Sequence, residues 1–227
     1  MGSPRAVNGW TFLGLAMALG GPLFLASPAA QVVLGRFEQD PPLAAELALW
    51  ALVGIVVTIL RFGERKPFAV IGLVRPRPAS VAWGLAAGIG VFVLLAVAAL
   101  TLRQMGLFDS ADASSTVLQW PLWFRAFAAS SAGLIEETLY RGYAIERLAP
   151  LVGGVRGAAV VALAAFALAH VPFWGWDAIA TPLLGGGFFT LLYLWRRDLV
   201  ACMVAHSTID LIGMVVIPAL TADRASG

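Results

Sequence analysis

Two kinds of chemically active side chain, carboxylates and imidazoles, interrupt apolar stretches in the C-terminal half of the chain. An ionisable group inside a membrane is costly to bury, so each of these residues is a candidate for function. A carboxylate beside two imidazoles can activate water, relay protons or bind zinc. The sequence has only two histidines, and both belong to this set. The residues are Glu136, Glu137, Arg141, His170, His206 and Asp210.

The two adjacent glutamates face different directions on a helix. Glu137 and Arg141 are four residues apart, so they share a face and can form an ion pair along the helix. Glu136 is rotated by about 100° from Glu137, and Arg141 therefore need not neutralise it. Tyr140 follows Glu136 by four positions and is a supporting candidate, although a packed ring also explains it. This spacing predicts that Glu137 and Arg141 are structural and that Glu136 is the free base.

The other candidates also form pairs one helical turn apart. Phe166 and His170 share a face of their helix. His206 and Asp210 do the same, and Asp210 can accept a hydrogen bond from an imidazole and fix its tautomer. Counted from the basic ends of the three helices, Glu136 lies about 16 Å deep, His170 about 21 Å and His206 about 13 Å. We therefore expect one acid and two imidazoles at a similar level near the middle of the membrane.

The composition of the chain requires a membrane environment. Of the 227 residues, 60% are hydrophobic and only 12% are charged, whereas a soluble domain carries about 25% charged residues. This excludes a water-soluble globule, and the high hydrophobicity excludes disorder. The single Cys202 excludes an internal disulfide. The net charge of +2 comes with no basic helix or basic-aromatic cluster, so we expect no nucleic-acid partner.

Apolar stretches close to the bilayer-spanning length of about 20 residues recur along the chain. They predict an all-α fold, a polytopic transmembrane helix bundle of about seven spans (roughly six to eight). We expect a single integral membrane domain over residues 1–227, with the first stretch retained as a helix and not removed as a signal peptide. Glu46, in the second stretch, is interpreted as an acid that snorkels to the surface. The expected spans are 10–34, 43–60, 80–102, 127–147, 156–172, 178–195 and 199–217.

Basic residues are distributed unequally between the two ends of this expected bundle. Ten Lys or Arg residues fall in one set of loops and four in the alternate set. Because positive residues remain on the cytoplasmic side, the bias predicts a cytoplasmic N-terminus. We expect an integral protein of a prokaryotic plasma membrane.

Three motifs follow one another on three of the expected helices. They are EETLYRG (136–142), FALAH (166–170) and HSTID (206–210). Their order resembles the EExxxR, FxxxH and HxxxN/D pattern of the CPBP intramembrane proteases, also called the Abi family, which include the type II CAAX prenyl endopeptidases. The resemblance covers residues 117–217, a CPBP-like catalytic core, and the earlier spans are similar to the family only in being hydrophobic.

The resemblance implies an endopeptidase in the lipid bilayer that acts on a membrane-associated protein or peptide. It assigns water activation to Glu136, proton transfer to His170 and polarisation of the carbonyl or stabilisation of the oxyanion to His206. Asp210 stands where prenyl-protein proteases usually carry Asn, which weakens the expectation of a prenylated substrate but not that of proteolysis. The expected supporting residues are Glu137, Arg141, Asp210, Phe166 and Tyr140.

Several alternatives stay open at this level. The compact HExxH motif is absent, so glutamate catalysis without a cofactor is the first expectation and a zinc metalloprotease that uses Glu136, His170 and His206 is the second. From other classes, the alternatives are a non-catalytic membrane scaffold or bacteriocin-immunity protein, and a proton-coupled transporter. Only the glycine run at 185–187 suggests the broken helix of a transporter. The sequence does not predict the oligomeric state.

Overall fold

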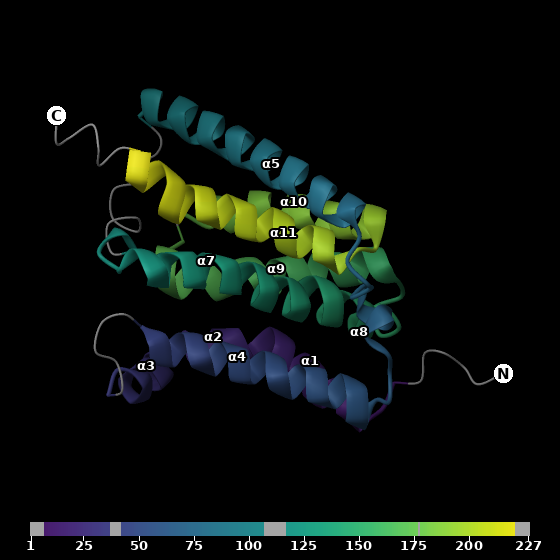
Figure 1. Ribbon diagram of the computed structural model, residues 1–227. Coiled ribbons are helices and arrows are strands. Elements are labelled where there is room, and N and C mark those ends of the chain that lie inside the picture. The colour runs from purple at the N-terminus through teal and green to yellow at the C-terminus, as the bar shows by residue number, and fades with distance from the viewer. Residues whose placement is uncertain (1–6, 37–41, 107–116, 177, 221–227) are drawn as a thin grey trace.

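Helices are the only regular structure in the part of the chain that the computed structural model describes, residues 7–36, 42–106, 117–176 and 178–220. This confirms the all-α bundle expected from the sequence (Figure 1). The N-terminal elements are α1 (Gly9–Leu15), η1 (Ala16–Gly20), α2 (Gly21–Leu25), α3 (Pro28–Leu34), α4 (Leu43–Thr58), η2 (Ile59–Gly63), η3 (Phe68–Ile71) and α5 (Pro78–Gln104). The C-terminal elements are α7 (Leu122–Glu136), η4 (Glu137–Ala144), α8 (Ile145–Leu148), α9 (Val155–Trp174), α10 (Ala180–Arg196), α11 (Leu199–Leu211) and η5 (Ile212–Val216).

Four stretches have both the length and the apolar composition to cross a membrane. They are Leu43–Gly63, Pro78–Thr101, Val155–Trp174 and Leu199–Leu220. The first expected span, over 10–34, is instead a pair of helices, Gly9–Leu25 and Pro28–Leu34, bent by 72°. If this bent pair counts as one span, five stretches among the described residues meet the criterion.

The bend in the first expected span follows from Ser27 and Pro28. A proline disfavours the helical conformation in the residue before it and is well suited to the first position of a new helix. Ser27 is accordingly extended, with φ −69° and ψ 150°, and its side chain accepts a hydrogen bond from the backbone N–H of Ala30. The chain therefore ends one helix and begins another at this point.

The two remaining expected spans are helical but do not meet the same criterion. The stretch over 178–195 is α10, which has 17 residues. The stretch over 127–147 lies in α7, η4 and α8, which follow one another without a break and carry several charged residues. Those charges are tolerable because the helix turns them toward the inside of the bundle, where they find partners.

Helix α11 lies between α5 and α7 and contacts both (Figure 1). Glycines allow these close crossings, as small residues do between membrane helices. A Cβ on Gly88 of α5 would lie 2.6 Å from the carbonyl oxygen of Ala205, and one on Gly133 of α7 would lie 2.2 Å from Oγ of Ser207. The helix with the HSTID motif is thereby pressed against the helix with the two glutamates.

The described residues have the inside–outside distribution of a protein in lipid. Large apolar side chains point outward, among them Phe24, Val160 and Leu191, each more than 60% exposed. Glu137 and Arg141 are instead completely buried. An exterior of this kind is stable only against hydrocarbon, because in water it would form one very large apolar patch. The protein is therefore an integral membrane protein.

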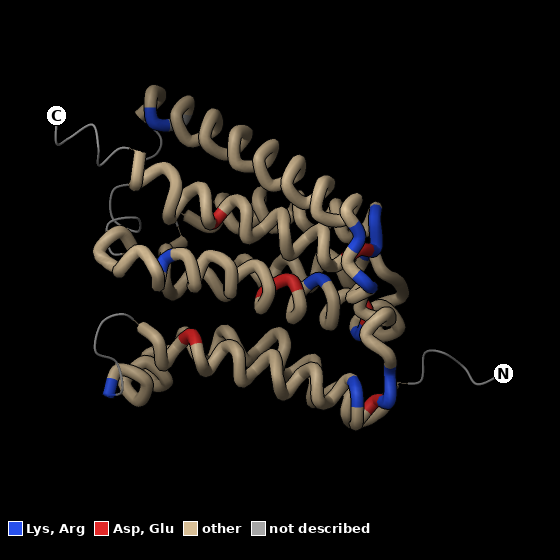
Figure 2. Tube along the Cα trace, in the orientation of Figure 1, with Lys and Arg blue, Asp and Glu red and all other residues tan. Residues whose placement is uncertain are grey.

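Lys and Arg residues crowd the end of the bundle near α8, and fewer lie at the opposite end (Figure 2). Arg147, the last residue of the expected span 127–147, is one of the basic residues at this end, and it is buried. Its Nε lies 3.0 Å from Oε2 of Glu64, whose Oε1 accepts a hydrogen bond from the hydroxyl of Tyr143 at 2.5 Å. This enclosed cluster joins the end of the α4–η2 helix to η4 and α8.

Candidate active site

The two glutamates lie where α7 changes into the π-helical segment η4. Segment η4 begins at Glu137, directly after Glu136, and the N–H of Ile145 bonds to the carbonyl of Tyr140, five residues earlier. π-Helical turns are frequent at functional sites. Residues four positions apart lie on the same side of a helix. Tyr140 is therefore aligned with Glu136, and Arg141 with Glu137.

The ion pair expected between Glu137 and Arg141 is present and enclosed. Nη1 of Arg141 donates a hydrogen bond to Oε1 of Glu137 at 2.9 Å. Nη2 donates to the carbonyl of Gly186 at 2.9 Å, and the guanidinium carbon lies 4.1 Å from the centre of the Phe166 ring. The buried cation is thus held by a carboxylate, a carbonyl and an aromatic face, as an uncompensated charge in this position would not be tolerated.

The glycine run of α10 is explained by this contact. A Cβ on Gly186 would lie 2.7 Å from the ring of Phe166 and 2.8 Å from Nη2 of Arg141. Helix α10 continues without a break from Ala180 to Arg196. The run therefore allows close packing, and it does not form the broken helix that a transporter would use to bind its substrate.

His206 is held from behind by the second glutamate. Its Nδ1 lies 2.8 Å from Oε1 of Glu137, and because a carboxylate only accepts, Nδ1 carries the hydrogen. Its Nε2 faces Glu136, with Oε2 at 3.8 Å, and Asp210, with Oδ2 at 3.5 Å. The sequence analysis expected Asp210 to fix an imidazole tautomer. Glu137 does so instead, because the packing of α11 on α7 turns Nδ1 toward it.

His170 has its tautomer fixed by the backbone of its own helix. Its Nδ1 lies 2.8 Å from the carbonyl oxygen of Phe166, which can only accept, so Nδ1 donates. The lone pair of Nε2 then faces the site, 3.9 Å from Oε2 of Glu136. The ring also packs against Trp174, with the ring centres 4.8 Å apart.

Glu136 lies between the two imidazoles. Its Oε2 is 3.9 Å from Nε2 of His170 and 3.8 Å from Nε2 of His206. Arg141 does not pair with it among the described contacts, and its side chain is 26% exposed, whereas that of Glu137 is fully buried. The structure thus brings together the acid and the two imidazoles that the depth count placed at one level, and it leaves the acid accessible from outside the bundle.

Phe166 is the ring around which the site is packed. Its ring centre lies 4.6 Å from that of His170, 5.2 Å from that of Tyr140 and 6.3 Å from that of His206. It therefore packs against both imidazoles as well as Arg141. Phe166 of the FALAH motif thus supports the site residues by packing and takes no part in the chemistry.

The donor types at the site suit zinc, since Glu136, His170 and His206 offer one carboxylate and two imidazoles. Within the described ranges, no group of three His, Cys, Asp or Glu side chains is placed so that it can hold a metal ion. Ligands that share a tetrahedral zinc at about 2.0–2.2 Å lie about 3.3–3.5 Å apart, closer than Glu136 lies to either imidazole. We derive no step through a metal.

Glu46 is a polar residue near the site that the sequence analysis misjudged. It was interpreted as snorkelling to the surface, but Oε1 is buried and the side chain interacts with Ser131 of α7. Ser131 also accepts a hydrogen bond from Nε1 of Trp50 at 3.1 Å. No local spacing reveals this contact, because Glu46 and Ser131 are on different helices that meet only in the folded bundle.

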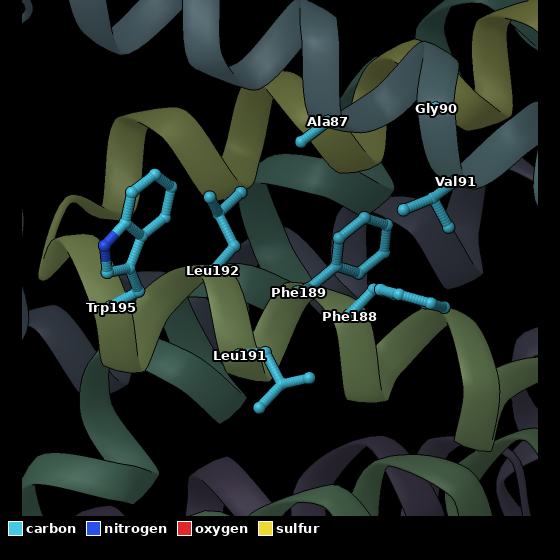
Figure 3. Close-up of a pocket in the computed structure, with 8 residues that line it drawn as sticks. All are labelled: Ala87, Gly90, Val91, Phe188, Phe189, Leu191, Leu192 and Trp195. Atoms are coloured by element: carbon cyan, nitrogen blue, oxygen red, sulfur yellow. The ribbon is translucent and has the colours of Figure 1, made fainter.

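An apolar pocket of about 410 Å³ lies behind His206, between α5 and α10 (Figure 3). Phe189 lines the pocket, and its ring is stacked on the imidazole of His206 with the ring centres 4.6 Å apart. One face of the catalytic candidate is thus shielded by hydrocarbon. The pocket is lined by Ala87, Gly90, Val91, Phe188, Phe189, Leu191, Leu192 and Trp195.

Comparison with known proteins finds a family model that matches the part of the chain that holds the site. Residues 118–212 match the family model described as type II CAAX prenyl endopeptidase Rce1-like. The match includes all three motifs and confirms the resemblance found in the sequence. No curated protein and no solved structure matches the chain.

Proposed function

We propose that this protein is an intramembrane endopeptidase that hydrolyses a peptide bond in a membrane-associated protein or peptide, because residues 118–212 match the family model of the Rce1-like type II CAAX prenyl endopeptidases. The observation that carries the proposal is the position of Glu136, an accessible carboxylate between two imidazole nitrogens. Its separation from Arg141 leaves it able to accept a proton, unlike Glu137, which already accepts two hydrogen bonds at Oε1.

Glu136 begins the reaction as a general base. It takes a proton from a water molecule while the water oxygen forms a bond to the carbonyl carbon of the substrate. The π electrons of the carbonyl move onto its oxygen. That oxyanion accepts a hydrogen bond from Nε2 of protonated His206, which Glu137 orients from the other side of the ring.

His170 completes the proton transfer. The proton that Glu136 accepted passes through Nε2 of His170 to the amide nitrogen as the C–N bond breaks. The products are a new carboxyl group and a new amine, and His170 and Glu136 return to their starting states. The bond from Nδ1 of His170 to the carbonyl of Phe166 supports this role, because it keeps Nε2 available on the side of the substrate.

We propose that catalysis is driven by the glutamate without a metal. If zinc were bound, Glu136, His170 and His206 would have to hold it, and it would supply Lewis-acid activation of the water. The absence of the compact HExxH motif of zinc proteases supports the preference for a metal-free reaction.

We also propose that the N-terminus is cytoplasmic and that the membrane is a prokaryotic plasma membrane. The excess of Lys and Arg at the α8 end of the bundle supports this orientation (Figure 2). Glu136, His170 and His206 then lie about 13–21 Å from the cytoplasmic ends of their helices.

The experiment that tests the proposal maps the termini of membrane proteins by mass spectrometry. Cells with the wild-type protein are compared with cells that lack it and with cells that carry Glu136→Gln. New termini present only with the wild-type protein identify the substrate and the cleavage site. Identical termini in all three strains would argue for a non-catalytic scaffold.

A further inference from the structure

The chain has three tyrosines, and they differ in what their hydroxyl groups contact. The hydroxyl of Tyr143 donates to Glu64 at 2.5 Å, and that of Tyr193 donates to Glu146 at 3.0 Å. The hydroxyl of Tyr140 has no hydrogen-bond partner in the described part of the chain, although the residue is only 1% exposed. A buried hydroxyl without a partner destabilises the folded protein, so its presence calls for a ligand.

A second unpartnered polar atom lies on the same face of the same helix. Oε2 of Glu136 is buried and has no hydrogen-bond partner among the described residues. Tyr140 follows Glu136 by four positions and so shares its side of the helix, and helical side chains lean toward the N-terminal turn, which is the turn that carries Glu136. Phe166 packs edge-on against the ring of Tyr140 with the ring centres 5.2 Å apart and restricts its movement.

These two atoms are complementary, because one is a donor and the other an acceptor. We propose that Tyr140 and Glu136 together hold the hydrolytic water. The Tyr140 hydroxyl donates a hydrogen bond to the water oxygen, and the water donates one of its own to Oε2 of Glu136. The remaining lone pair of the water then faces the substrate carbonyl carbon, so that Tyr140 fixes the direction of attack while Glu136 removes the proton.

Glu137 also has an unpartnered oxygen, Oε2, but it does not compete for this role. Its side chain is fully buried, and its other oxygen already accepts hydrogen bonds from Arg141 and His206. The side chain of Glu136 is instead 26% exposed, so of the two carboxylates it is the one that lies toward the outside of the bundle.

This inference rests on the proposed peptidase function, and the variant Tyr140→Phe tests it against a matched control. The full-length protein is assayed with an internally quenched peptide that contains the cleavage site found by terminal mapping. Tyr140→Phe removes a hydroxyl without a protein partner, so the melting temperature should stay the same or rise. We expect kcat to fall about tenfold with KM unchanged, because the free energy of about one hydrogen bond corresponds to a tenfold change in rate.

The control variant is Tyr143→Phe. It leaves Glu64 without the hydroxyl donor, so it should lower the melting temperature but not the kcat of the folded protein.

A second measurement does not depend on the substrate. A high-resolution experimental structure of the wild-type protein should contain a water within hydrogen-bond distance of both the Tyr140 hydroxyl and Oε2 of Glu136, and the Tyr140→Phe structure should have lost it. Absence of that water, or native kcat in Tyr140→Phe while Glu136→Gln is inactive, would overturn the role of Tyr140 alone. If Glu136→Gln is itself fully active, the proposed function fails together with this inference.

Discussion

Nδ1 of His206 lies 2.8 Å from Oε1 of Glu137, so the second glutamate of the pair orients the imidazole, while the first lies near Nε2 of both histidines. The same oxygen of Glu137 accepts a hydrogen bond from Arg141. Glu137 therefore joins a buried cation on its own helix to a histidine on α11. Two adjacent carboxylates thereby have separate tasks, one in holding the site together and one in the reaction.

Arg141→Ala should lower both the folded yield and the melting temperature in detergent. It leaves Glu137 as a buried charge without its cation, a change that typically costs about 3–5 kcal/mol. The control is Arg197→Ala, which breaks the partly exposed pair with Glu146 and should cost about 0–1 kcal/mol. An Arg141→Ala protein with native yield and melting temperature but no activity would instead indicate a direct role in the reaction.

Gly186→Ala should destabilise the protein and reduce its activity. The new methyl group would lie 2.7–2.8 Å from the ring of Phe166 and from Nη2 of Arg141, so both must move. Such overpacking typically costs about 1–3 kcal/mol. Gly187→Ala is the matched control, since its nearest neighbour would be 4.0 Å away. Equal melting temperatures for the two variants, measured side by side, would contradict this account of the glycine run.

Removal of metal should leave the activity intact. Protein treated with a chelator and then dialysed should keep its turnover, and elemental analysis should find less than one zinc per chain. Stoichiometric zinc that is lost together with activity, and restored with it on re-addition, would establish the metalloprotease alternative.

Local features of this structure were predictable from the sequence, and contacts between distant segments were not. Helical periodicity alone predicts that Glu137 pairs with Arg141 and that Glu136 points to a different side of the helix. The bond between Glu137 and His206 joins residues 69 positions apart. It depends on the close crossing of α7 and α11 at Gly133, which no periodicity reveals.

The same distinction explains the errors in the fold. A count of apolar residues gave one helix over 10–34, because it ignored how Pro28 constrains Ser27. It also gave no sign that Arg147 is buried, because its partner Glu64 lies more than 80 residues away. Charged residues mark the ends of membrane helices only when the fold does not bury them with a partner.

The most direct test of the account compares Glu136→Gln with Glu137→Gln in turnover and in thermal stability. Glu136→Gln preserves size and polarity while removing the base, so it should fold normally, bind the substrate and lose on the order of 10²-fold or more in kcat. Glu137→Gln should mainly lower the melting temperature, because it removes the negative charge that compensates the buried Arg141. Near-native cleavage by Glu136→Gln beside a well-folded, inactive Glu137→Gln would contradict the assignment of Glu136 as the residue that activates water.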